Sequence, residues 1–163
     1  IIARGVMLDI AGLKGVDVLP PSYGIGPDDI RAAVKRQNVA LEKGDVVTLR
    51  TGRMTLWPDH DKYLIDEPGL NVEGAQYLAE ECGCIGIGAD NVALEQLPSA
   101  DPESYLPVHC YLFAVVGVVI IEVLMLEELA RDGISEFAFF GAPLRLRGST
   151  GAPMRTFAIP FGS

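Results

Sequence analysis

Two residues of types that commonly bind metal ions lie on either side of a long apolar run. His109 precedes residues 111–121, and Glu122 follows them. An imidazole nitrogen and a carboxylate oxygen are ligands that suit Zn²⁺, Mn²⁺ or Fe²⁺. The spacing is too loose to define a motif, so a complete site needs one or two further ligands from elsewhere.

The surroundings of Glu122 leave two interpretations open. Apolar residues flank it on both sides in residues 118–124. A carboxylate placed near the core is costly unless it is neutralised, paired or bound to a metal. Alternation along a strand would instead direct Glu122 to solvent, and the spacing alone does not decide between the two.

The remaining candidate groups favour ordinary structural roles. His60 lies in a polar turn and is expected to be solvated. Cys82 and Cys84 are one residue apart, which matches neither a redox motif nor a zinc motif, so both are interpreted as packing residues. The glycines at 83, 86 and 88 lack the dinucleotide-binding order, and no Gly-x-Ser-x-Gly sequence indicates a serine hydrolase.

Composition excludes several classes of protein. The 163 residues, of which 49% are hydrophobic, predict a single domain spanning 1–163. A formal charge of -9 argues against nucleic acid as a partner. The longest apolar run is about half of what a bilayer span needs, so no membrane association is expected. Three cysteines without paired spacing favour the cytoplasm.

Short apolar runs separated by Gly and Pro predict alternating strands and helices. Pro and acids at the start of 27–36, with bases at its end, are typical of a helix, and β-branched residues in 46–51 favour a strand. The pattern predicts an α/β or α+β domain with a mixed sheet. Further strands are expected at 5–10, 84–88, 136–140 and 155–159, and further helices at 73–81 and 126–131.

Several short sequences, in their order along the chain, resemble the metal-dependent cyclase-like hydrolases, a family that includes kynurenine formamidase and isatin hydrolase. The likeness runs almost from end to end. The matching segments are Arg4-Gly-Val-Met-Leu-Asp9, Gly44-Asp-Val-Val-Thr-Leu-Arg-Thr-Gly52, Ile85-Gly-Ile-Gly-Ala-Asp90, Pro107-Val-His109, Ile120-Ile-Glu122 and residues 143–155.

The resemblance implies a swivelling β/β/α fold and hydrolysis of a small-molecule amide, such as an aryl formamide or a cyclic amide. It places His109 and Glu122 where some members have ligands to Zn or Mn. The metal would polarise the substrate carbonyl and lower the pKa of a water molecule. The resemblance also implies a homo-oligomer, to which the apolar segments 111–121 and 137–140 would contribute surface.

The family's His-x-Gly-Thr-His-x-Asp-x-Pro signature is absent from the chain. We therefore expect an N-terminally truncated, C-terminal portion of the fold, completed by an upstream segment or a partner chain. The alternative is a catalytically silent binding or scaffold protein. Arg53 stands where members commonly have Trp, which affects the expected substrate pocket, and Met125 where an Asp would cap a helix.

Overall fold

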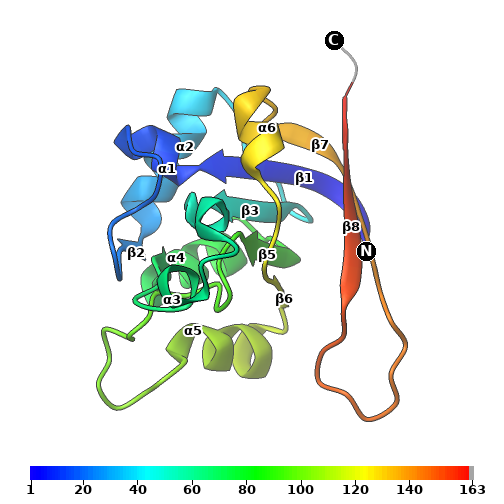
Figure 1. Ribbon diagram of the computed structural model, residues 1–163. Helices are drawn as coiled ribbons and strands as arrows, with labels where there is room; N and C mark the ends of the chain where they lie inside the picture. Colours follow the sequence, from blue (N-terminus) through cyan, green and yellow to red (C-terminus); the bar gives the residue numbers. More distant parts are fainter. Residues whose placement is uncertain (162–163) are drawn as a thin grey trace.

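A computed structural model describes residues 1–161 as a mixed β-sheet with short helices around it (Figure 1). The main sheet has the strand order β6-β5-β3-β1-β7-β8. The first four strands in that order run parallel, whereas β7 pairs antiparallel with β1 and with β8. A small parallel sheet joins β2 and β4. The strands are β1 (Ile2–Asp9), β2 (Gly24–Ile25), β3 (Val46–Arg50), β4 (Gly69–Leu70), β5 (Gly86–Ala89), β6 (Val119–Ile121), β7 (Glu136–Pro143) and β8 (Met154–Pro160).

Most helices pack on one face of the main sheet. On that face the alternating residues Val6 and Leu8 of β1 lie in a core that also contains Ile30, Leu78 and Leu112 from helices. None of the helices in residues 1–161 has the length and hydropathy needed to cross a membrane. The helices are α1 (Ile10–Lys14), α2 (Pro27–Gln37), η1 (Arg53–Leu56), α3 (His60–Tyr63), α4 (Val72–Gln76), η2 (Tyr77–Glu81), α5 (Pro107–Cys110), η3 (Tyr111–Val116) and α6 (Glu127–Arg131).

The opposite face of the sheet holds a second, smaller core. Met7 of β1 and Val46 of β3 meet Phe137 and Phe139 of β7 there, and Leu126, just before α6, packs against them. The β7–β8 hairpin lies at the border of the molecule, away from most of the helices (Figure 1). This second face is therefore covered much less by helices than the first.

The observed elements confirm the predicted α/β class with a mixed sheet. Each predicted strand and helix has a counterpart, although most of the boundaries differ by a few residues. The apolar run 111–121 is not one element. Pro107 begins a helix that continues through η3, Gly117 ends it with a φ of 70°, and only the last residues of the run form β6. His109 consequently lies in α5, whereas Glu122 directly follows β6.

Asn71 caps the N-terminus of α4. Asn71 Oδ1 accepts a hydrogen bond from the backbone N–H of Gly74 at 2.8 Å. We expect Asn71→Ala to lower the free energy of unfolding by about 1 kcal/mol, because that N–H loses its partner. Urea denaturation measures the change. Asn71→Asp keeps an acceptor and serves as the control; an equal loss in both variants would contradict the capping role.

Candidate functional site

His109, in α5, lies between two carboxylates that come from different parts of the fold. Its Nδ1 atom is 2.6 Å from Glu95 Oε1, and its Nε2 atom is 3.3 Å from Glu122 Oε1. Glu122 follows directly on β6, the outermost parallel strand, whereas Glu95 lies in the segment after β5 and forms a bridge with Leu70 of β4. Residues far apart in sequence thus meet beside the edge of the sheet.

Glu95 is held by more than the imidazole. Its side chain is buried, and its two oxygens accept backbone N–H groups from Val108 at 3.1 Å and from His109 at 3.0 Å. The carboxylate therefore fixes both the start of α5 and the orientation of the His109 ring. The hydrogen bonds from Glu122 and Glu95 raise the pKa of His109 to about 9, against the opposing effect of burial.

Sequence reasoning missed Glu95. It lies in an irregular segment rather than in an amphipathic or alternating pattern, and its partners follow it by 13 and 14 residues. The only available signal was an acidic residue within an otherwise apolar context, Val92-Ala-Leu-Glu-Gln-Leu97. That signal is too weak to distinguish a buried acceptor from an exposed loop carboxylate.

The structure decides between the two interpretations of Glu122. Its side chain is 37% exposed, so it lies at the surface and not in the core, although its carboxylate is paired. Because the strand ends at Ile121, the side chain lies at the border of the sheet and pairs with His109 instead. His109 is more enclosed, with 19% exposure, and its ring meets the edge of Phe113.

An open trough of about 1660 Å³ adjoins this pair. His109, Phe113 and Glu122 line one part of it, and β7 and β8 contribute the opposite part through residues such as Phe139 and Thr156. Thr48 of β3 also lines the trough, and its buried hydroxyl has no hydrogen-bond partner among residues 1–161. The trough thus runs from the candidate ligands across the less covered face of the sheet.

The donor chemistry at His109 and Glu122 fits two positions of a metal site. With Nδ1 directed at Glu95, the other ring nitrogen faces the Glu122 carboxylate, which is the arrangement typical of a metal-binding histidine and its supporting carboxylate. Within residues 1–161, however, no group of three or more His, Cys, Asp or Glu side chains could hold a metal ion. The described residues therefore do not form a complete metal site by themselves.

Asp90, at the end of β5, organises the loop after β3. Its carboxylate accepts hydrogen bonds from the backbone N–H of Thr51 at 2.9 Å, the hydroxyl of Thr51 at 2.6 Å and the backbone N–H of Gly52 at 2.8 Å. The Tyr63 hydroxyl donates to the backbone carbonyl of Asp90 at 2.9 Å. Burial raises the pKa of the Asp90 carboxyl, and the three donors oppose that shift.

Arg53 has a structural role. It is buried, its Nε donates to the backbone carbonyl of Tyr63 at 3.1 Å, and a second guanidinium nitrogen donates to the carbonyl of Ile65. Arg53, which stands where the resemblance leads one to expect Trp, thus fixes the position of the segment that contains α3. His60, in the same segment, is exposed as expected and meets Trp57 edge-on.

The three cysteines are free thiols, and Cys84 is buried, which confirms its packing role. Burial raises the pKa of the Cys84 thiol to about 12, whereas Cys110 is exposed. We expect iodoacetamide at about pH 8 to alkylate Cys84 at least a hundredfold more slowly than Cys110, because thiolate formation and access are both suppressed. Peptide mass spectrometry over time measures both rates; equal rates in folded protein would contradict this.

Comparison with known proteins gives a single family. Residues 1–96 match the family described as "Putative cyclase". Cyclase-like protein 3 from Oryza sativa subsp. japonica is 26% identical over 156 residues, which make up 93% of this chain and 53% of that protein. The chain thus spans about half the length of this curated relative.

Solved structures agree in fold. A novel cyclase has 34% identity and a TM-score of 0.84, covering 96% of this chain and 52% of its own. Isatin hydrolase A from Ralstonia solanacearum has 20% identity and a TM-score of 0.80, covering 95% of this chain and 59% of its own. An isatin hydrolase bound to the product analogue thioisatinate has 21% identity and a TM-score of 0.82, with coverages of 98% and 61%.

Proposed function

Because this chain belongs to the putative cyclase family, we propose that it forms part of a metal-dependent hydrolase that cleaves a C–N amide bond. The substrate would be a small molecule, either an aryl formamide or a cyclic amide. Two of the structural neighbours are isatin hydrolases, which supports hydrolysis as the reaction type.

The observation that carries the proposal is the position of His109 between Glu95 and Glu122. His109 and Glu122 would hold a divalent ion, Zn²⁺ or Mn²⁺. Such an ion supplies Lewis acidity, which polarises a carbonyl group and acidifies water. Glu95 holds a proton on Nδ1 and directs Nε2 toward Glu122, where a metal ion would take the place of the Nε2 proton.

The apolar trough next to this pair would receive the organic part of the substrate. Its lining next to His109 includes Phe113, and Phe139 lies on the far side. Apolar walls with a few polar groups at one end are typical of small-molecule sites. The remaining ligands would come from polypeptide equivalent to the part of the relatives that this chain does not match, in the same protein or in a partner chain.

Removal of the Glu122 carboxylate tests the proposal. We expect Glu122→Ala to lower the affinity of the full-length protein, which supplies the remaining ligands, for Zn²⁺ or Mn²⁺ at least tenfold, as is typical for loss of a ligand. Isothermal titration with the metal alone and the metal content of purified protein measure the effect. Glu128→Ala removes another carboxylate that lines the trough and is the matched control.

An unchanged metal affinity in Glu122→Ala would contradict the assignment of Glu122 as a metal ligand. If the full-length wild-type protein takes up no metal at all, the alternative of a catalytically silent binding or scaffold protein is favoured. In that case Glu122→Ala should change only stability. Circular dichroism verifies that each variant is folded before its metal affinity is compared.

A further inference from the structure

The segment that carries Glu95 is held by a second buried carboxylate. Glu67 lies between α3 and β4 and is only 2% exposed. Its Oε2 atom accepts hydrogen bonds from the backbone N–H groups of Val92 at 2.8 Å and Ala93 at 3.1 Å. Its main-chain carbonyl accepts the N–H of Leu97 at 2.8 Å. Glu67 therefore contacts this segment on both sides of Glu95.

The backbone between these contacts has a conformation that needs support. Leu94 is fully buried and has a φ of 57°, and the N–H of Glu95 donates to the carbonyl of Ala93. A three-residue turn whose central residue has a positive φ is rare and strained. On its other side, the Leu94 carbonyl accepts the N–H of Leu70 at 2.9 Å, and a Cβ on Gly69 would lie 2.4 Å from the carbonyl carbon of Glu95. The turn is therefore fixed between the buried carboxylate and β4.

The same segment also contacts the backbone next to Glu122. The main-chain carbonyl of Asn91 accepts the N–H of Val123 at 2.9 Å. Asn91 is fully buried, and its Nδ2 atom donates to the carbonyl of Pro68 at 2.7 Å. Val123 has a φ of 58°, which β-branched residues rarely adopt. The backbone beside Glu122 is thus connected to the two residues Glu67 and Pro68.

We infer that Glu67 is a positioning residue, which holds residues 92–97 and thereby orients Glu95 and, through Glu95, the ring of His109 for metal binding. This inference rests on the proposed function. An ionised carboxylate accepts N–H groups more strongly than a neutral side chain does, which suits it to fix a strained turn. A site loses affinity when the groups that support its ligands allow them to shift by about 1 Å.

Replacement of the Glu67 acceptor in the full-length protein tests the inference. Glu67→Met has nearly the same length but no strong acceptor for Val92 and Ala93, whereas Glu67→Gln keeps an oxygen that can take the place of Oε2. We expect Glu67→Met to lower the affinity for Zn²⁺ at least tenfold and Glu67→Gln to stay within about threefold of the wild type. Isothermal titration with Zn²⁺ below the unfolding transition measures both affinities.

Proton NMR of the metal-free protein separates this inference from the proposed function. The Nδ1–H of His109 should exchange slowly with solvent in the wild type and in Glu67→Gln, and at least tenfold faster in Glu67→Met, because its acceptor Glu95 is displaced. If the wild type bound no Zn²⁺, the proposed function would fail, and the exchange rates would still decide the role of Glu67. Circular dichroism verifies folding. If Glu67→Met does not fold, Glu67→Asp replaces it with the same expected results, because the shorter side chain cannot reach both N–H groups.

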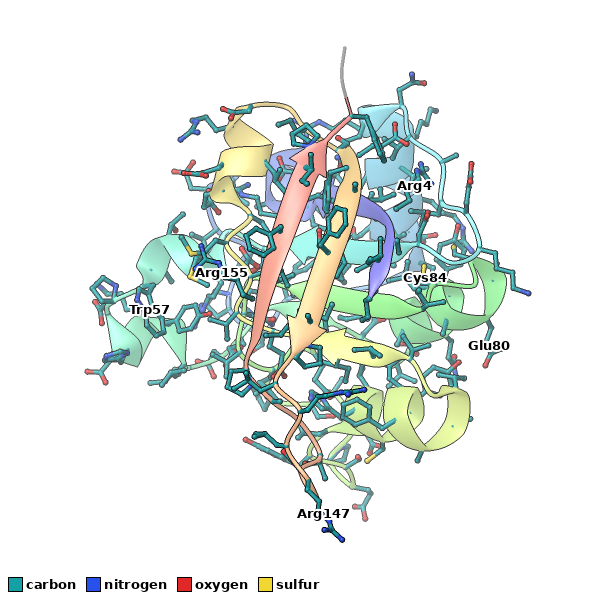
Figure 2. The ribbon with its side chains drawn as sticks, turned by 90° about the vertical axis from the view of Figure 1, so that its right-hand side faces the viewer. Arg4, Trp57, Glu80, Cys84, Arg147 and Arg155 are labelled. Atoms are coloured by element: carbon teal, nitrogen blue, oxygen red, sulfur yellow. The ribbon has the colours of Figure 1, made fainter. Side chains whose placement is uncertain are left out.

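Asp45→Ala is the matched control. Like Glu67, Asp45 is 2% exposed and accepts a backbone N–H, that of Glu42, at 2.7 Å. It precedes β3, at the end of the parallel strands opposite to the candidate site. Figure 2 shows its ion-pair partner Arg4 on the opposite side of the molecule from Trp57, which lies in the segment that leads to Glu67.

Asp45→Ala should therefore lower stability but leave the Zn²⁺ affinity and the exchange of the His109 Nδ1–H unchanged. Equal effects of Asp45→Ala and Glu67→Met on these two measurements would overturn the inference. So would a Glu67→Met variant, or its replacement Glu67→Asp, that retains the wild-type values of both. Recovery of both values in Glu67→Gln would support an acceptor at this position as the cause.

Discussion

Glu95→Gln is expected to weaken Zn²⁺ binding by 10- to 100-fold while the protein remains folded. The amide keeps the size of the side chain and one acceptor oxygen, but it removes the charge that orients the His109 ring. It also places an NH₂ group against a backbone donor, because Glu95 accepts from both Val108 and His109. Loss of the group that supports a ligating histidine typically costs this much affinity.

Two measurements separate this positioning role from a general loss of stability. Titration with Zn²⁺ below the unfolding transition gives the affinity of folded protein, which a merely structural role would leave unchanged. Proton NMR of the His109 ring reports the Nδ1–H hydrogen bond, which should be protected from exchange in the wild type and lose its protection in Glu95→Gln. Glu103→Gln, at an exposed loop position, is the matched control.

Asp90→Ala is expected to cost roughly 3–5 kcal/mol of unfolding free energy, the largest stability effect that we predict. The substitution leaves three donors from Thr51 and Gly52 without their buried acceptor. Urea denaturation measures the loss. Asp101→Ala changes an exposed carboxylate and should alter stability little. A loss below about 1 kcal/mol in Asp90→Ala would contradict the anchoring role.

The same carboxyl predicts a pH dependence. Burial raises the pKa of Asp90 in the folded state, so folded protein binds this proton more tightly than the unfolded chain does. The stability gained by binding this proton is complete below the pKa that the Asp90 carboxyl has in the unfolded chain. It is lost as the pH rises through the pKa that the carboxyl has in the folded protein. Asp90→Asn has no such titration. The stability of the wild type relative to Asp90→Asn should therefore be greater at about pH 4 than at about pH 8. Urea denaturation at both pH values measures this difference. A relative stability that increases with pH would contradict a raised pKa of Asp90.

The sequence predicted elements where local chemistry and tertiary packing agree. Pro27 and the acids after it favour the start of α2, and the β-branched residues of Val46–Arg50 favour a central strand. The secondary structure of residues 111–121 was harder to predict, because the valines favour a strand while Pro107 and Gly117 delimit a helix. An apolar run without polar interruptions has no periodicity that separates a buried helix from a strand.

The candidate site was predictable only in part. Residue type and resemblance singled out His109 and Glu122, and the structure brings the two within 3.3 Å. Their assignment as metal ligands stays a prediction. Glu95 could not be found from the sequence, because its importance depends on the path of an irregular segment across β4 and toward α5. Contacts of that kind depend on the whole fold and leave no local pattern.

The central position of β1 has a consequence for the order in which the chain folds. Within residues 1–161, β1 is synthesised before the other strands, and its parallel neighbour β3 follows within about 40 residues, whereas its antiparallel neighbour β7, which brings Phe140 against Ile2, comes much later. The parallel strands and the helices that cover them can therefore pack together before β7 and β8 have left the ribosome. One edge of β1 stays unpaired until the β7–β8 hairpin has been synthesised, and during that interval this edge is open to aggregation.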